Sequence, residues 1–184
     1  MENQNFKIEK TTVECYKIRH ESGMYWADIT IDVTSDRSGR ISISSDYGNY
    51  ANYWGACGRG FKQFLIDLNL EYTADKFGAD RWFDLESTLK TYKNRVLEIR
   101  KEERMGADVA REIWTQIQEL EDCSNISEFE ARMWDKSKLM WMYDHCPDIN
   151  YDITPQFKKF WKTVWPIFID AIMAEIIVDA TAVN

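Results

Sequence analysis

The fold is decided by residues 42–68, which read SISSDYGNYANYWGACGRGFKQFLIDL. Aromatic, glycine and turn residues fill the first half of this stretch, and apolar residues at helical spacing fill the second. The turn-forming segment Asp46–Asn49 leads into a short predicted strand at Tyr50–Trp54. Gly58–Gly60 then predicts a change from strand to helix. The helix is expected to close one face of the sheet through Phe61, Phe64, Leu65 and Leu68.

Strands are also predicted upstream of this stretch. Val13–His20 and Met24–Thr34 are expected to pair across the turn at Ser22-Gly23, and Arg40–Ser45 follows a second turn. Apolar and polar residues alternate along the second strand, which is typical of a half-buried strand. The N-terminal third therefore predicts an antiparallel meander of three or four strands. Its inward residues are expected to be Tyr25, Ala27, Ile29, Ile31, Val33, Ile41 and Ile43.

The middle of the chain predicts a helical hairpin. Asp84 is a favourable N-cap for a helix that runs to about Arg104, and a second helix follows the break at Gly106. The first helix carries a narrow apolar seam of the coiled-coil type. The seam could pack within the hairpin or join two copies in a homodimer. It consists of Leu85, Leu89, Tyr92, Val96 and Ile99, and the facing residues are Val109, Ile113, Ile117 and Leu120.

Further helices are predicted towards the C-terminus. Ser127 is expected to cap a helix that continues toward Asp144, with Glu130 completing a capping box. Residues 147–154 are expected to form a loop. The last helix is predicted to begin near Pro155 and to kink at Pro166, because a proline ring clashes with the preceding turn.

Together these patterns predict an α+β protein, with an N-terminal antiparallel β-meander of three to four strands packed on helices, followed by a helical C-terminal half. We expect residues 1–80 to form the sheet with its covering helix and residues 81–184 to form a helical region packed on it. A chain of 184 residues fits a single compact domain of this kind.

Amino-acid composition limits the kinds of partner and the cellular location that we expect for this chain. The chain has 23 basic and 31 acidic residues, a net charge of −8, and 8 tryptophans. The negative charge disfavours direct attraction to nucleic acid or anionic membranes, and it would suit docking on a basic protein surface. The N-terminal residues contain no apolar signal-like run, and the four cysteines form no CxxC pair, so the expected location is a reducing cytosol, that is, cytoplasmic.

No catalytic signature stands out. His145 and Cys146 are adjacent in the sequence, which does not orient them toward each other, and no HxxxH or HExxH pattern completes a metal site. The glycine-rich segment Gly55–Gly60 lacks the GK[ST] ending of a phosphate-binding loop. We therefore expect a protein that is not an enzyme and has no cofactor or metal.

The aromatic cluster is the predicted partner-binding site. Tyr and Trp dominate the energetics of protein interfaces, and exposed rings can also stack on unpaired bases. The competing interpretation is that about half of these rings pack between sheet and helix, as strand alternation requires. The predicted site consists of Asp46, Tyr47, Tyr50, Tyr53, Trp54 and Arg59.

These residues also carry a resemblance. The segment Asp46–Tyr50 with Trp54-Gly55, and Phe160-Trp161 with Trp165-Pro166, resemble the DYGNY…YWG and FW…WP signatures of a family of small proteins carried by phages and prophages. Some phage-borne proteins of this size and acidity are anti-CRISPR inhibitors, including inhibitors of the type II-A effector nuclease Cas9. The family pattern contains no catalytic residues that could be assigned to this chain.

The resemblance implies a phage-derived inhibitor of bacterial defence that binds a CRISPR effector or an effector–guide complex, with nucleic acid reached through that partner. The alternative is an accessory protein of phage replication that binds single-stranded nucleic acid through the aromatic strand. Direct binding to single strands would weaken steeply as salt rises.

Overall fold

A computed structural model describes residues 7–182, without the side chains of residues 179, 180 and 182. The chain divides into two compact units. The sheet unit comprises the described residues of 1–80 and 153–184, and the helical unit comprises residues 81–152. The sequence analysis placed the described residues from 153 onward in the helical region. In the structure they belong to the sheet unit.

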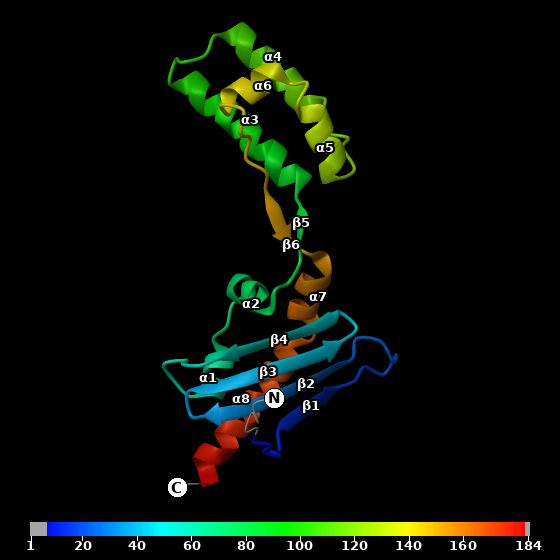
Figure 1. Ribbon diagram of the computed structural model, residues 1–184, viewed down its shortest axis with the longest axis vertical. Coiled ribbons are helices and arrows are strands. Elements are labelled where there is room, and N and C mark those ends of the chain that lie inside the picture. Colours follow the sequence, from blue (N-terminus) through cyan, green and yellow to red (C-terminus); the bar gives the residue numbers. More distant parts are fainter. Residues whose placement is uncertain (1–6, 183–184) are drawn as a thin grey trace, which may run out of the picture. The chain divides into compact units, whose positions relative to one another are not determined.

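The sheet unit is built on a four-stranded antiparallel sheet in the order β1-β2-β3-β4 (Figure 1). Its register pairs Ile29 with Ile43 and Ile31 with Ile41, so these side chains share one face. The predicted meander is confirmed. The strands are β1 (Glu14–Ile18), β2 (Ala27–Ser35), β3 (Ser38–Ser45) and β4 (Gly48–Trp54).

Helices cover the apolar face of this sheet, while the opposite face is turned toward the viewer in Figure 1. The four isoleucines of β2 and β3 are buried with Phe157, Phe160, Phe168 and Ile172 in one core. Val33, predicted to point inward, is exposed because it lies beside a register shift in the β2–β3 pairing. The covering helices are α1 (Phe61–Ile66), α2 (Leu70–Phe77), α7 (Pro155–Thr163) and α8 (Trp165–Ala182).

The change from strand to helix after β4 depends on close packing at Gly39. A Cβ atom placed on Gly39 would lie 2.5 Å from a ring carbon of Phe61, the first residue of α1. The Phe61 ring is buried and also contacts the Trp54 ring, with centroids 6.1 Å apart. Absence of a side chain at Gly39 therefore lets α1 approach β3 closely.

The helical unit contains four helices around a second core. The predicted seam of Leu89, Tyr92, Val96 and Ile99 is buried inside this unit with Ile113 and Ile117, so it serves the hairpin and is not available to a second copy. The N-cap Asp84 is confirmed, since its carboxylate accepts a hydrogen bond from the Ser87 N–H. The helices are α3 (Leu85–Lys101), α4 (Ala107–Gln118), α5 (Ile126–Met133) and α6 (Ser137–Met142).

The prediction of one helix from Ser127 toward Asp144 is wrong at both its start and its middle. Asn125 is the N-cap, and the Glu128 carboxylate reaches back to the Ser124 N–H at 2.9 Å. This backbone hydrogen bond is the main reason that the pKa of Glu128 is lowered. The helix breaks after Met133 because a straight continuation would turn polar Lys136 and Ser137 toward the core. The break lets Leu139 and Met140 become buried instead.

Two short strands were not predicted from the sequence. β5 (Arg81–Phe83) and β6 (Tyr151–Ile153) form a two-stranded sheet, and β6 lies in the predicted loop. The expected kink at Pro166 is a break between α7 and α8, with Pro166 in the first turn of α8. Proline is well tolerated there because the first N–H groups of a helix have no intrahelical partner.

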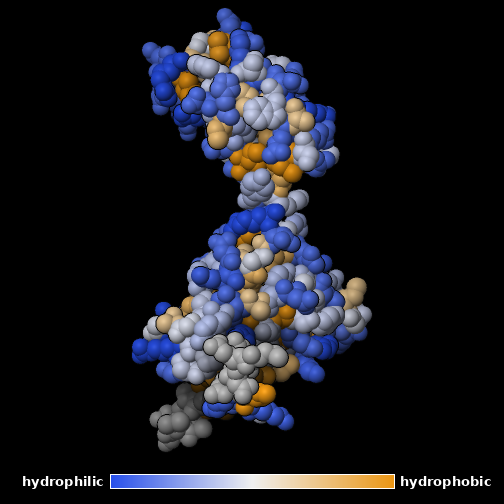
Figure 2. Space-filling view, in the orientation of Figure 1, coloured by the Kyte–Doolittle hydropathy of each residue, from blue (hydrophilic) through white to orange (hydrophobic). Residues whose placement is uncertain are grey.

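The visible surface is mainly hydrophilic, with small apolar groups (Figure 2).

We expect Gly39→Ala to lower the free energy of unfolding by about 1–3 kcal/mol, because the added methyl group meets the buried Phe61 ring. Chemical denaturation followed by circular dichroism measures this change. Gly55→Ala is the matched control, since its Cβ would lie 3.8 Å from the nearest side-chain atom. Equal losses in the two variants would contradict the packing constraint at Gly39.

The helical unit is also expected to lose stability in alkali. The hydroxyls of Tyr92 and Tyr143 are buried without a hydrogen-bond partner, and burial raises the pKa of Tyr143 from 10.0 to about 12. Its contribution to stability is complete below pH 10 and is lost as pH rises toward 12, because the unfolded chain releases the proton first. Urea midpoints between pH 8 and 12 should fall less steeply for Tyr143→Phe. Identical slopes for both proteins would contradict this assignment.

Candidate functional site

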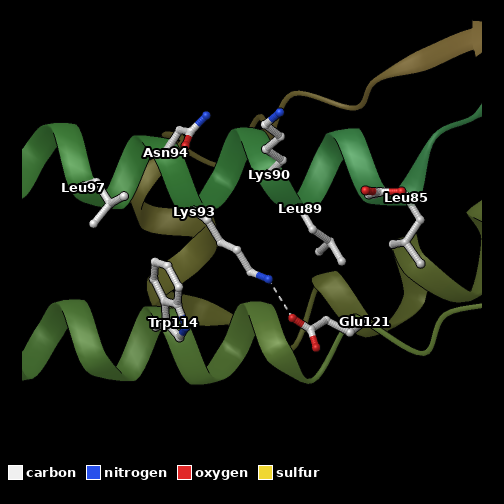
Figure 3. A pocket seen from close by; sticks show the side chains of 9 residues that line it. Leu85, Leu89, Lys90, Lys93, Asn94, Leu97, Trp114 and Glu121 are labelled. Atoms are coloured by element: carbon white, nitrogen blue, oxygen red, sulfur yellow. Dashed lines mark hydrogen bonds and ion pairs between the residues drawn. The ribbon is translucent and has the colours of Figure 1, made fainter.

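A groove of about 620 Å³ runs along α3 in the helical unit and is bordered by Trp114 of α4 (Figure 3). Helices α3 and α4 form the predicted antiparallel hairpin, and the groove runs along their contact on the surface of the hairpin. It is lined by Leu85, Glu86, Leu89, Lys90, Lys93, Asn94, Leu97, Trp114 and Glu121.

The groove arises from a second stripe on α3, beside the buried seam. Leu85, Leu89, Lys93 and Leu97 follow one another at intervals of four residues, which places them in one row along a helix. Leu89 is shared between the core and the groove, whereas Leu97 is 53% exposed. The wall of the groove is therefore an apolar ridge interrupted by a single cation.

Lys93 divides the groove into two apolar halves. Figure 3 shows its side chain passing between Trp114 and Leu89 to reach Glu121, and its Nζ lies 2.7 Å from the Glu121 carboxylate. The same ammonium group lies 5.9 Å from the centre of the Trp114 ring, within cation–π range. Because the ion pair is partly exposed, it contributes at most about 1 kcal/mol. A ligand could therefore displace Lys93 at small cost.

The chemistry of the groove favours binding. Its nine lining residues include no cysteine, histidine or serine, so they supply no nucleophile–base pair of the usual kind. They supply three leucines, one tryptophan ring and charges of both signs. An apolar recess with a few charged groups at its edge is the usual form of a binding site.

The predicted aromatic site on β4 is largely part of the core of the sheet unit. Tyr47 and Trp54 are buried, because the inward positions of the hairpin pack on the helices. The Trp54 ring N–H donates a hydrogen bond to the Tyr72 hydroxyl at 2.9 Å, and the Tyr47 hydroxyl accepts one from Thr163 at 3.0 Å. The expectation that these two rings are exposed anchors is therefore corrected.

Tyr50 has a mixed position. Its ring contacts those of Phe77 and Phe157, and its hydroxyl donates a hydrogen bond to the Tyr47 carbonyl at 2.5 Å. Burial, with a smaller contribution from the charge of Asp80, raises the pKa of Tyr50. The hydroxyl therefore stays protonated and supports the turn that precedes β4.

The remaining members of the predicted site reach the surface. The Tyr53 ring is 51% exposed, and Asp46 and Arg59 are also exposed. The Asp46 carboxylate accepts a hydrogen bond from the backbone N–H of Trp26, and Arg59 forms an ion pair with Asp67. A single exposed ring makes a poor stacking platform for unpaired bases, which need successive aromatic side chains. The partner-binding role of these three residues stays a prediction.

A polar cluster that the sequence analysis missed joins three elements of the sheet unit. Lys62 of α1 lies 2.6 Å from Glu14 of β1 and 2.8 Å from Glu175 of α8. The Tyr16 hydroxyl lies 2.8 Å from both carboxylates. These residues are up to 161 positions apart in the sequence, between Glu14 and Glu175, and no local pattern connects them.

The protonation of this cluster fits a structural clamp. Burial and the hydrogen bonds to the carboxylates raise the pKa of Tyr16. Desolvation acts to lower the pKa of Lys62, but its hydrogen bonds to Glu14 and Glu175 outweigh that effect and raise it. Lys62 is therefore charged and Tyr16 neutral at physiological pH. Neither group is poised to exchange a proton near neutrality.

His145 and Cys146 line one recess of the helical unit, and both residues are exposed. Burial raises the pKa of Cys57 and of Cys123, which makes both thiols less nucleophilic. Within residues 7–182, no group of three or more Cys, His, Asp and Glu side chains is placed to hold a metal ion. A search of the same residues finds no helix with the length and hydrophobicity needed to cross a bilayer.

Comparison with known proteins identifies the family. Curated proteins and solved structures give no match to this chain. The sequence model of a family described as a phage family matches residues 6–175, which is most of the chain and includes both units. The chain therefore belongs to this family of phage proteins.

Proposed function

We propose that the protein is a non-enzymatic phage inhibitor that binds a defence complex in the cytoplasm of the infected bacterium. The specific candidate partner is a CRISPR effector, such as Cas9 with its guide RNA, which would make the protein an anti-CRISPR. Two observations support the proposal: the phage family of the chain and the groove beside α3. The groove carries the argument because it offers apolar surface to a partner.

The groove fits an amphipathic helix of the partner. The ridge from Leu85 to Leu97 comprises 13 residues, and its ends lie about 18 Å apart along a helix axis, which matches roughly three turns of a second helix. Such a helix would place apolar side chains at positions i, i+3 or i+4, and i+7 against the ridge. Trp114 would contact it from α4, as aromatic residues commonly do in interfaces.

Charge would guide the approach. The helical unit has 11 basic and 16 acidic residues, and a nucleic-acid-binding protein presents basic surface. Complementary charge raises association rates and sets orientation more than it raises affinity. The apolar groove would then supply most of the binding free energy.

Size-exclusion chromatography with the purified Cas9–guide complex tests the proposal. We expect the protein to co-elute with the complex and DNA cleavage by the complex to fall as the protein is added. The same mixtures with effector–guide complexes of other CRISPR types extend the test. Separate elution from all of them, with unchanged cleavage, would contradict the anti-CRISPR function.

Leu97→Glu is expected to weaken partner binding at least tenfold, because it places a charge on the exposed end of the apolar ridge. A tenfold loss corresponds to about 1.4 kcal/mol, and isothermal titration calorimetry can measure it. Val33→Glu is the matched control, since Val33 is an exposed aliphatic residue of the sheet unit. Both variants change exposed positions, so both should fold.

Tyr53→Ala distinguishes the groove from the predicted surface at Asp46, Tyr53 and Arg59. We expect it to bind like the wild-type protein if the groove provides the interface. Loss of binding in Tyr53→Ala, together with normal binding in Leu97→Glu, would move the interface to the strand surface and contradict the role of the groove.

A further inference from the structure

Lys93 interrupts the apolar ridge of the α3 groove. It lies between Leu89 and Leu97 in the row, and its side chain crosses the groove beside Trp114 to reach Glu121 (Figure 3). The Lys93 side chain is 32% exposed. A helix that lies along the ridge would cover it, because the leucines on either side of it are the contacts that an amphipathic helix needs. Which helices can bind therefore depends on what they offer to Lys93.

The ammonium group of Lys93 has a hydrogen-bond donor to spare. A lysine carries three N–H donors. The Glu121 carboxylate, at 2.7 Å from Nζ, engages one of them, and the Trp114 ring, whose centre lies 5.9 Å from Nζ, faces the same group. On the open surface the remaining donor can bond to water. A covering helix would remove that water, and a cation buried with an unpaired donor is costly. The helix must therefore supply an acceptor.

A carboxylate is the acceptor that suits this position best. Hydrogen bonds between an ammonium group and a carboxylate are about twice as strong as those between neutral groups. The ion pair of Lys93 with Glu121 is partly exposed and weak, so Lys93 can turn toward a second acid at small cost. The ridge reads Leu, Leu, Lys, Leu at residues 85, 89, 93 and 97. The complementary stripe therefore has three apolar residues and one acid, which faces Lys93.

We propose that Lys93 selects the partner: the helix that binds in the groove carries an aspartate or glutamate within its apolar stripe, paired with the Lys93 ammonium group. The inference rests on the proposed function only in that the groove binds a partner helix, and it does not require that partner to be a CRISPR effector. A helix with an uninterrupted apolar stripe would leave the lysine unpaired. Selectivity then combines an attractive pair for one helix with a desolvation cost for the others.

Synthetic helical peptides test the pairing without a natural partner. Each peptide has about 14 residues and a lactam bridge on its solvent side, because short isolated helices are marginal in water. Its stripe holds three leucines and, at the remaining place, glutamate, glutamine or leucine. Peptides with this place second or third in the stripe cover both helix directions. Fluorescence anisotropy with the full chain measures the dissociation constants. In one direction, we expect the glutamate peptide to bind about tenfold tighter than the glutamine and leucine peptides.

Variants of the full chain locate the preference at Lys93. Lys93→Met keeps an apolar stem without the charge, so it should abolish the preference for glutamate, whereas Lys93→Arg should keep it. Glu121→Gln removes the competing acid and should tighten binding of the glutamate peptide about threefold. Lys138→Met is the matched control and should bind like the wild-type protein, since Lys138 pairs with Glu112 in the same unit and lines no part of the groove.

The outcomes separate this inference from the proposed function. Equal binding of the glutamate and leucine peptides, or a preference for glutamate that survives in Lys93→Met, would overturn the role of Lys93 and leave the groove as a helix-binding site. No binding by any peptide, or binding that Leu97→Glu leaves unchanged, would overturn the inference together with the groove. Selective binding of the glutamate peptide by a chain that forms no complex with Cas9–guide would contradict the anti-CRISPR function alone.

Discussion

Packing of aromatic rings between the sheet and its helices is the interaction on which the sheet unit depends. Tyr50 of β4 contacts Phe77 of α2 and Phe157 of α7, and Trp54 contacts Phe61 and Phe64 of α1. The contact between Tyr50 and Phe157 joins the N-terminal sheet to a helix 107 positions later in the chain. The C-terminal residues are therefore part of the sheet unit, and the helical unit lies between two segments of it in sequence.

This division gives the two units different roles in our account. In the sheet unit, the large rings of β4 mostly pack in the core. The polar cluster around Lys62 holds β1, α1 and α8 together. In the helical unit, the short hairpin buries one side of α3 and leaves the next stripe as a groove. Because a two-helix hairpin offers such a groove to a third helix, this unit is the better candidate for partner recognition.

Much of the fold could be predicted from sequence because its signals are local. Alternation along β2, the cap at Asp84 and the seam of α3 all depend on residues within one element. The break after Met133 was missed because it depends on where the rest of the unit places its core. The site was harder to predict: Tyr47 and Trp54 have the residue types of an interface, and only tertiary packing shows that they are buried. The groove could have been noticed from the row Leu85, Leu89, Lys93 and Leu97, which was partly hidden by the stronger seam beside it.

Hydrogen–deuterium exchange of the full chain, with and without the Cas9–guide complex, locates the binding surface, because it reports every backbone segment in one experiment. If the groove is the interface, binding slows exchange along residues 85–97 and around Trp114, the segments that form the groove. Slower exchange only at β4, or unchanged exchange throughout the helical unit while the complex forms, would contradict it.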